Sequence, residues 1–92
     1  MSKIPDYLQI NEGNIVVTLH SGVTIDGAKI KTLTMREPLV QDTLAVSAIS
    51  GNEAEKELGY FANLCSVAPD DLKTMTMRDY TRLQTAFGNF TD

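Results

Sequence analysis

The spacing of apolar residues along the chain changes between residues 33 and 42. Before this segment apolar residues recur in the short rhythm of β-strands, and after it they recur at the three-and-four spacing of helices. Pro38 lacks a backbone N–H and biases Glu37 toward extended backbone, so a strand can end here and a helix can begin just after it. The pattern therefore predicts an α+β fold, in which an N-terminal β-hairpin or three-stranded antiparallel meander precedes three to four short α-helices.

The predicted strands lie in the first third of the chain. Residues 1–13 mix apolar and turn-forming side chains, which favours an extended arm that can include a short strand. Residues 14–36 are predicted to form the β-hairpin, with extended runs at 15–19 and 28–35. Between these runs stands Asp26-Gly27, a favoured turn pair.

The second extended run contains a change of phase. Ile30 and Thr32 alternate with lysines, whereas Leu33 and Met35 continue on the opposite phase. Because strand side chains alternate strictly between two faces, either a β-bulge re-aims the strand or both faces are covered near its end.

Residues 38–90 are predicted to form the helical part. Turn and cap residues divide it, since Gly51 is a natural helix stop and Pro69 suits a first helical turn. Thr76 with Asp79 three residues later is a variant of the capping box. The predicted helices begin near Leu39, Asn52, Pro69 and Thr76; the first ends near Ser50-Gly51 and the last near Gly88.

Length, charge and cysteine content limit the function classes. The 92 residues are expected to form one domain with a small core. Eight Lys and Arg against twelve Asp and Glu give a net charge of −4, which argues against nucleic acid or an anionic membrane as a partner. One cysteine, no apolar run near the ~20 residues of a membrane span and no basic-then-apolar start predict a soluble cytoplasmic protein.

No constellation of residues predicts catalysis, a metal site or a cofactor. His20 is the single histidine and is expected at the surface beside a turn, whereas Cys65 lies on an apolar helical stripe and is expected to be buried. Acidic residues two apart in the second helix point in different directions, so they match the helix dipole rather than bind a cation. The prediction is a protein that is not an enzyme.

Two structural hypotheses follow for the charged and apolar residues that remain. Arg36 is expected to bridge to Asp42 and to brace the corner between strand and helix. Leu58, Phe61, Leu83 and Phe87 are expected to pack the helices on the sheet, which leaves a surplus of apolar side chains. The predicted partner contacts are Tyr60, Leu64, Met75, Met77 and Phe90, the methionines because their side chains adapt to varied surfaces.

The order of these signals resembles the phage tail assembly chaperone family, the E, 41 or 14 group of tailed phages and prophages. The most specific part is the string Leu-Thr-Met-Arg-Glu-Pro followed by an aspartate, and the Asp-Tyr pair near the C-terminus supports it. The residues that carry the resemblance are Leu33, Arg36, Glu37, Pro38, Asp42, Asp79 and Tyr80.

The resemblance implies a non-enzymatic binder of the tape-measure protein, made in the cytoplasm of the host bacterium and absent from the mature virion. It would keep the long tape-measure chain soluble until the tail tube forms around it. A longer frameshifted form of the same protein is a further implied partner, and self-association into a homo-oligomer stays open. Two alternatives stay open: a small structural tail component, such as a connector or baseplate adaptor, and a regulatory protein-binding module.

Overall fold

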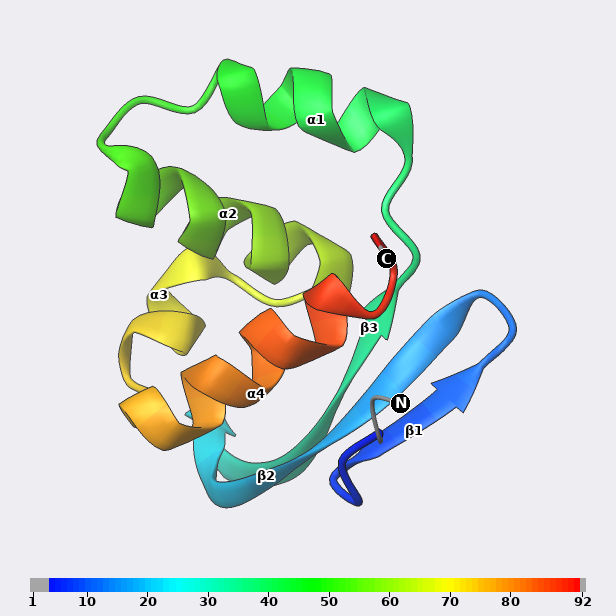
Figure 1. Ribbon diagram of the computed structural model, residues 1–92. Coiled ribbons are helices and arrows are strands. Elements are labelled where there is room, and N and C mark those ends of the chain that lie inside the picture. The colour runs from blue at the N-terminus through cyan, green and yellow to red at the C-terminus, as the bar shows by residue number, and fades with distance from the viewer. Residues whose placement is uncertain (1–3, 92) are drawn as a thin grey trace.

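The computed structural model describes residues 4–91 and shows a three-stranded sheet followed by four helices (Figure 1). The predicted α+β class is confirmed, and the sheet is the meander rather than a lone hairpin. The first three residues of the predicted arm lie outside the described residues. The elements are β1 (Leu8–Asn11), β2 (Asn14–Ile25), β3 (Ala28–Arg36), α1 (Val40–Ser47), α2 (Glu53–Cys65), α3 (Pro69–Lys73) and α4 (Met77–Gly88).

The sheet is antiparallel in the order β1-β2-β3. Its first turn uses Gly13 at φ 86°, and its second uses Asp26 and Gly27 at φ 52° and 81°. Two successive residues with positive φ match the twist of a two-residue hairpin, and Asp-Gly is a pair that tolerates this geometry. The turn predicted at Asp26-Gly27 is therefore confirmed.

β2 does not stop at residue 19 but continues through a bulge. The pairing passes from Thr18↔Thr32 to Val23↔Ile30, so β2 has four residues, 19–22, where β3 has only Lys31, and the three extra residues stand on β2. Ile30 and Leu33 both reach the core despite their opposite phases, because the extra residues shift the register between them. The predicted bulge exists, but it lies on β2 and not on the run at 28–35.

The core lies between one face of the sheet and helices α2 and α4 (Figure 1). Val17, Met35 and Leu83 are completely buried there, and Phe61 of α2 stacks with its ring centroid 5.4 Å from that of Phe87 in α4. α1 is set farthest from the sheet and contacts α2. No helix in residues 4–91 is long and apolar enough to cross a membrane.

The helix caps predicted at Asn52 and Thr76 are both present, but the second is incomplete. Asn52 caps α2 through a reciprocal capping box with Glu55. Thr76 caps α4 by accepting a hydrogen bond from the backbone N–H of Asp79 at 3.2 Å, but the Asp79 carboxylate does not return to Thr76. It bonds to the bulge of β2 instead, so the predicted capping-box variant is only half formed.

Candidate functional site

The corner between β3 and α1 is held by a bidentate ion pair. Arg36 Nη1 donates to Asp42 Oδ2 and Nη2 donates to Oδ1, each at 2.8 Å. Asp42 Oδ2 also accepts the backbone N–H of Leu39 at 2.7 Å, which satisfies an open donor at the start of α1. The predicted bridge between Arg36 and Asp42 is confirmed.

Asp42 also connects α1 to α2. Its Oδ1 accepts a hydrogen bond from Asn63 Nδ2 at 3.3 Å, and the residue is 5% exposed. The hydrogen bond from Arg36 and that from the Leu39 N–H lower the pKa of Asp42 to about 2. The carboxylate therefore stays ionised at neutral pH and fixes which side of α1 faces the protein.

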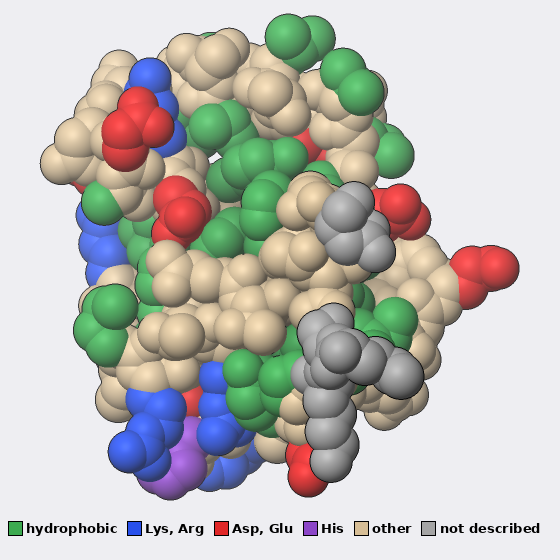
Figure 2. Space-filling view, in the orientation of Figure 1, with side chains coloured by type: hydrophobic (Ala, Val, Ile, Leu, Met, Phe, Trp, Pro, Cys, Tyr) green, Lys and Arg blue, Asp and Glu red, His purple; other side chains and the backbone are tan. Residues whose placement is uncertain are grey.

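The opposite side of α1 is apolar and exposed. Leu39, Val40 and Leu44 are 53%, 82% and 67% exposed, and we call this surface the outer face of α1. Figure 2 shows hydrophobic side chains projecting along the edge of the molecule over α1. The one charged residue of helix α1, Asp42, is paired with Arg36 and turned inward. The outer face of α1 therefore carries no charge.

The inner side of α1 touches α2 only in part. Ile49, just after the helix, lies so close to Gly59 that a Cβ at that glycine would be 2.9 Å from Ile49 Cδ1. Farther along, a hollow of about 300 Å³ separates the two helices from α4; its lining residues are Val46, Glu53, Lys56, Glu57, Tyr60, Phe61 and Phe87. α1 is thus a short helix tied firmly at its start and backed by open space.

α4 is fixed to the sheet by a second buried carboxylate. Asp79 is 0% exposed and accepts the backbone N–H groups of His20, Ser21 and Gly22 at 2.6, 3.0 and 3.0 Å. Burial raises the pKa of Asp79, but the three N–H donors outweigh it and hold the pKa below its ordinary value. Asp79 therefore sets the position of α4 against the bulge.

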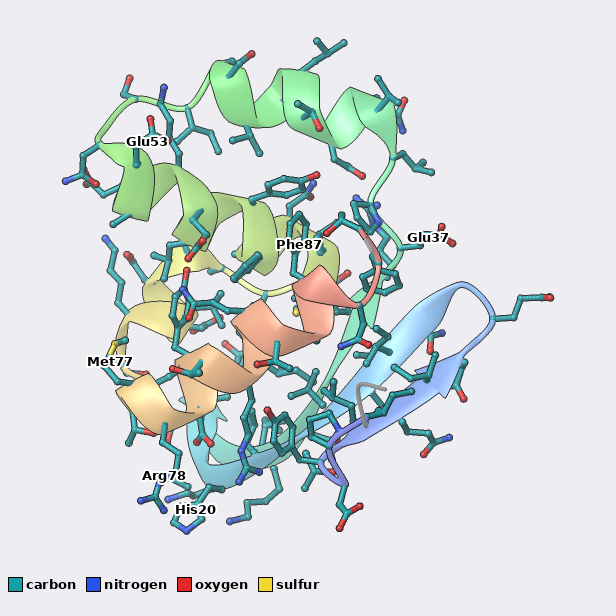
Figure 3. The ribbon with its side chains drawn as sticks, in the orientation of Figure 1. His20, Glu37, Glu53, Met77, Arg78 and Phe87 are labelled. Carbon is teal, nitrogen blue, oxygen red and sulfur yellow. The ribbon has the colours of Figure 1, made fainter. Side chains whose placement is uncertain are left out.

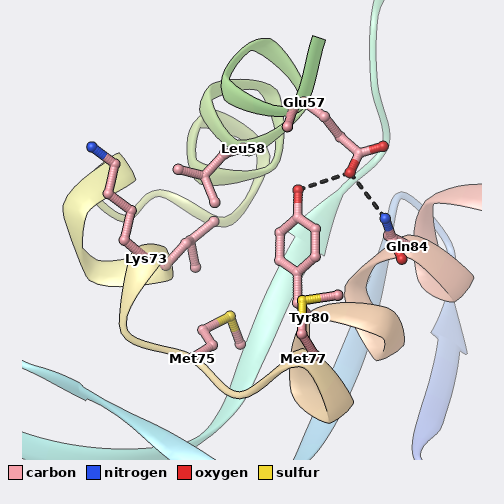
Figure 4. A pocket seen from close by; sticks show the side chains of 9 residues that line it. Glu57, Leu58, Lys73, Met75, Met77, Tyr80 and Gln84 are labelled. Atoms are coloured by element: carbon pink, nitrogen blue, oxygen red, sulfur yellow. Dashed lines mark hydrogen bonds between the residues drawn. The ribbon is translucent and has the colours of Figure 1, made fainter. Parts of the chain in front are cut away.

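A groove of about 350 Å³ opens between α2, α3 and α4 (Figure 4). We call it the methionine groove because Met75 and Met77 form one of its walls. Its lining residues are Ala54, Glu57, Leu58, Leu72, Lys73, Met75, Met77, Tyr80 and Gln84.

One wall of the methionine groove is held rigid by hydrogen bonds. The Tyr80 hydroxyl donates to Glu57 Oε1 at 2.8 Å, and Gln84 Nε2 donates to the same oxygen at 3.0 Å (Figure 4). Burial raises the pKa of the Tyr80 phenol, and the neighbouring Glu57 raises it further. Tyr80 therefore remains a neutral donor that joins α4 to α2.

The predicted partner contacts fall into three environments. Met75 and Met77 come together in the methionine groove, and Met77 is 71% exposed. Tyr60 and Phe90 are half-buried against the core. Leu64 is 1% exposed, so its predicted exposure is wrong: it lies one turn after Phe61 and packs into the core between α2 and β3. The binding role of the other four stays a prediction.

Sequence reasoning missed the outer face of α1. Neither Val40 nor Leu44 is among the partner contacts that it predicted. The signal was available, because residues two positions from Asp42 project about 200° away from it around a helix. Once Asp42 is paired with Arg36 and turned inward, Val40 and Leu44 must face outward.

The side chains that could bind a metal are dispersed, and the histidine and the cysteine lie in a surface and a core environment. Nowhere in residues 4–91 do three His, Cys, Asp or Glu side chains gather as a metal site would require. His20 is exposed and accepts from Arg78 Nη1 at 3.1 Å, as expected of a surface histidine. Cys65 is buried as predicted, and burial raises the pKa of its thiol to about 12, which keeps it protonated. The geometry offers contact surfaces.

Comparison of the sequence with known proteins identifies a family. Residues 16–92 match the model of the family described as phage tail assembly chaperone proteins, E, or 41 or 14. This match spans both buried carboxylates, the outer face of α1 and the methionine groove. Neither a curated protein nor a solved structure matches the chain.

Proposed function

The chain belongs to the family of phage tail assembly chaperone proteins, E, or 41 or 14, and on that premise we propose that it binds the tape-measure protein and keeps it soluble before tail assembly. The single observation that supports this most is the outer face of α1. Three large apolar side chains stand exposed on one short helix and the residue just before it, in a small acidic protein. Such a surface is typical of a site that a protein partner covers.

The outer face of α1 suits a partner that is helical and apolar in patches. An uncharged helical stripe can pack lengthwise on another helix without leaving a buried charge unpaired. Full burial of each of its side chains is worth about 1.5–3 kcal/mol, less the cost of association. This gives reversible binding, which a chaperone needs because the growing tail tube must displace it.

The methionine groove is a second contact in this proposal. Met75 and Met77 have flexible, polarizable side chains, so they can adjust to successive segments of a long partner. Net charge of −4 on the bound copies would repel other coated chains and oppose aggregation. The proposed place of action is the host cytoplasm, before the virion is complete.

Co-expression with the tape-measure protein tests this function. We expect the wild-type chain to raise the soluble yield of the tape-measure protein and to co-purify with it. The double variant Val40→Glu/Leu44→Glu should lose both effects, since it places charge on the outer face of α1. A double variant on the polar positions of the same helix, Gln41→Glu/Thr43→Glu, adds equal charge and should retain them.

Two results would contradict the proposal. One is a tape-measure protein that stays insoluble whether or not the chain is present. The other is the recovery of the chain from purified virions in stoichiometric amount, which would make it a structural tail component. Circular dichroism melting of each variant would check that loss of binding is not loss of folding.

A further inference from the structure

Half of the basic residues of this acidic chain gather at one end of the molecule. Four of its eight Lys and Arg surround residues 18–22, the bulge of β2, and we call Lys29, Lys31, Arg78 and Arg82 the basic cluster. Figure 2 shows blue side chains around the purple His20 at this end, and Figure 3 places Arg78 beside His20. The contacts proposed above, the outer face of α1 and the methionine groove, do not include these four residues, so the basic cluster needs a separate account.

Direct contacts hold the basic cluster over the bulge. Arg82 Nη1 donates to the carbonyl oxygen of Thr18 at 2.8 Å, and Lys31 Nζ donates to that of His20 at 3.2 Å. Arg78 Nη1 donates to His20 Nε2 at 3.1 Å. Within residues 4–91 each arginine makes one such bond, although a guanidinium has five N–H donors. Most donors of Arg78 and Arg82 therefore remain open to a ligand.

No salt bridge joins the basic cluster to an acidic side chain among the described residues, although the charge of Arg82 helps to lower the pKa of Asp79. The ion pairs in residues 4–91 are Arg36–Asp42 and Lys73–Asp70, which lie elsewhere. Asp79 is adjacent in sequence to Arg78, but its carboxylate is turned inward and is occupied by the three backbone N–H groups of the bulge. The outer surface at this end is thus positive on a chain whose net charge is −4.

The two arginines line a shallow, open hollow of about 490 Å³ together with Tyr7 and Thr81. Arg78 and Arg82 stand four residues apart on α4, so they project from the same side of that helix. The guanidinium of Arg82 lies 4.3 Å from the centroid of the Tyr7 ring, and this stacking holds it in place. Two fixed guanidinium groups beside one hollow form a natural receptor for carboxylates.

We propose that the basic cluster binds an acidic segment of a partner protein, with a carboxylate seated in the hollow that Arg78 and Arg82 line. A short acidic segment fits because the positive surface is confined to one end. A nucleic acid strand carries charge along its whole length and would run onto the acidic remainder of the chain. The proposal is independent of tape-measure binding, which uses the outer face of α1.

Binding of a fluorescein-labelled octaglutamate peptide, followed by fluorescence anisotropy at low salt, tests this inference. The double variant Lys31→Gln/Arg78→Gln should weaken peptide binding about fivefold or more, since each of the two substitutions removes one exposed positive charge that would contact the peptide. The matched control, Lys56→Gln/Lys73→Gln, removes the same charge from α2 and α3 and should change affinity less than about twofold. Neither double variant alters Arg82, whose packing on Tyr7 supports the fold.

Three outcomes would overturn the proposal. Equal weakening by both double variants would show that only net charge matters. Tighter binding of a labelled octathymidylate than of octaglutamate would assign the basic cluster to nucleic acid. Concentration-dependent self-association that Lys31→Gln/Arg78→Gln abolishes would make a second copy the occupant.

Discussion

The carboxylate of Asp79 accepts a backbone hydrogen bond from Gly22, 57 residues earlier in the chain, at 3.0 Å. This contact joins the first turn of α4 to the bulge of β2 and explains why an acidic residue stands there, completely buried. It also makes the bulge and the helix depend on each other, so a change in either should disturb both.

Replacing Asp79 should therefore be costly. Asp79→Asn removes the charge and sets an amide N–H₂ against backbone N–H donors, and we expect a loss of about 3 kcal/mol in the free energy of unfolding, since buried unpaired donors cost about 1–3 kcal/mol each. Urea unfolding measures this loss. Asp70→Asn, at an exposed position of α3, is the control and should cost less than about 0.5 kcal/mol. Similar values for both variants would contradict the assigned role of Asp79.

A side chain at Gly22 should lower the free energy of unfolding more than one at Gly13. It has φ +90°, and a Cβ would lie 3.0 Å from the carbonyl oxygen of Ile30. Gly13 has nearly the same φ, +86°, but open space around its Cβ position. We expect Gly13→Ala to cost about 1 kcal/mol from backbone strain alone and Gly22→Ala to cost about 2 kcal/mol or more. Thermal melts compare the two, and an equal loss would show that the Ile30 contact relaxes freely.

The pair Arg36–Asp42 predicts a dependence of stability on acid pH. The folded-state pKa of Asp42 is about 2, below the ordinary value near 3.8, so its ionisation stabilises the folded state above about pH 4. This contribution is lost as the pH falls toward 2. Melting temperatures from pH 6 to pH 2 should fall more steeply for the wild type than for Asp42→Asn, which already lacks the contribution at pH 6. Parallel curves would show that the pKa of Asp42 is the same in the folded and unfolded states.

Among the predicted partner contacts, Met77 and Phe90 should respond differently to a charge. Met77 is 71% exposed, so Met77→Glu should weaken partner binding while stability changes by less than about 1 kcal/mol. Phe90 is half-buried against the core, so Phe90→Glu should cost stability as well, about 1–3 kcal/mol. Pull-down with the tape-measure protein and urea unfolding separate the two effects. Unchanged binding by Met77→Glu would remove the methionine groove from the interface.

Features decided by neighbouring residues could be predicted from the sequence. The turn at Asp26-Gly27, the cap at Asn52 and the bridge from Arg36 to Asp42 each depend on residues at most six apart. Local backbone preference and short-range pairing are enough to specify them. The α+β order was predictable for a similar reason, since it follows from the local change in apolar spacing between residues 33 and 42.

Features decided across the fold could not be predicted in the same way. The bulge appears on β2 because Asp79 supplies acceptors for its N–H groups, and only the packed structure brings α4 to that strand. Leu64 was expected at the surface because its helical stripe is broad, yet the sheet covers that side of α2. The side chain of Val40 points outward because that of Asp42, on the other side of the helix, points inward to Arg36. The spacing of apolar residues alone does not show this.

The outer face of α1 and the bulge of β2 lie at opposite ends of a molecule that extends 34 Å along its longest axes (Figure 1). A protein seated on one end would leave the other uncovered, so the two occupants need not compete for space. One copy would then act as a bivalent adaptor, and the second partner would meet the first at the high effective concentration that tethering provides. A single small domain would in this way bring two components of one assembly together.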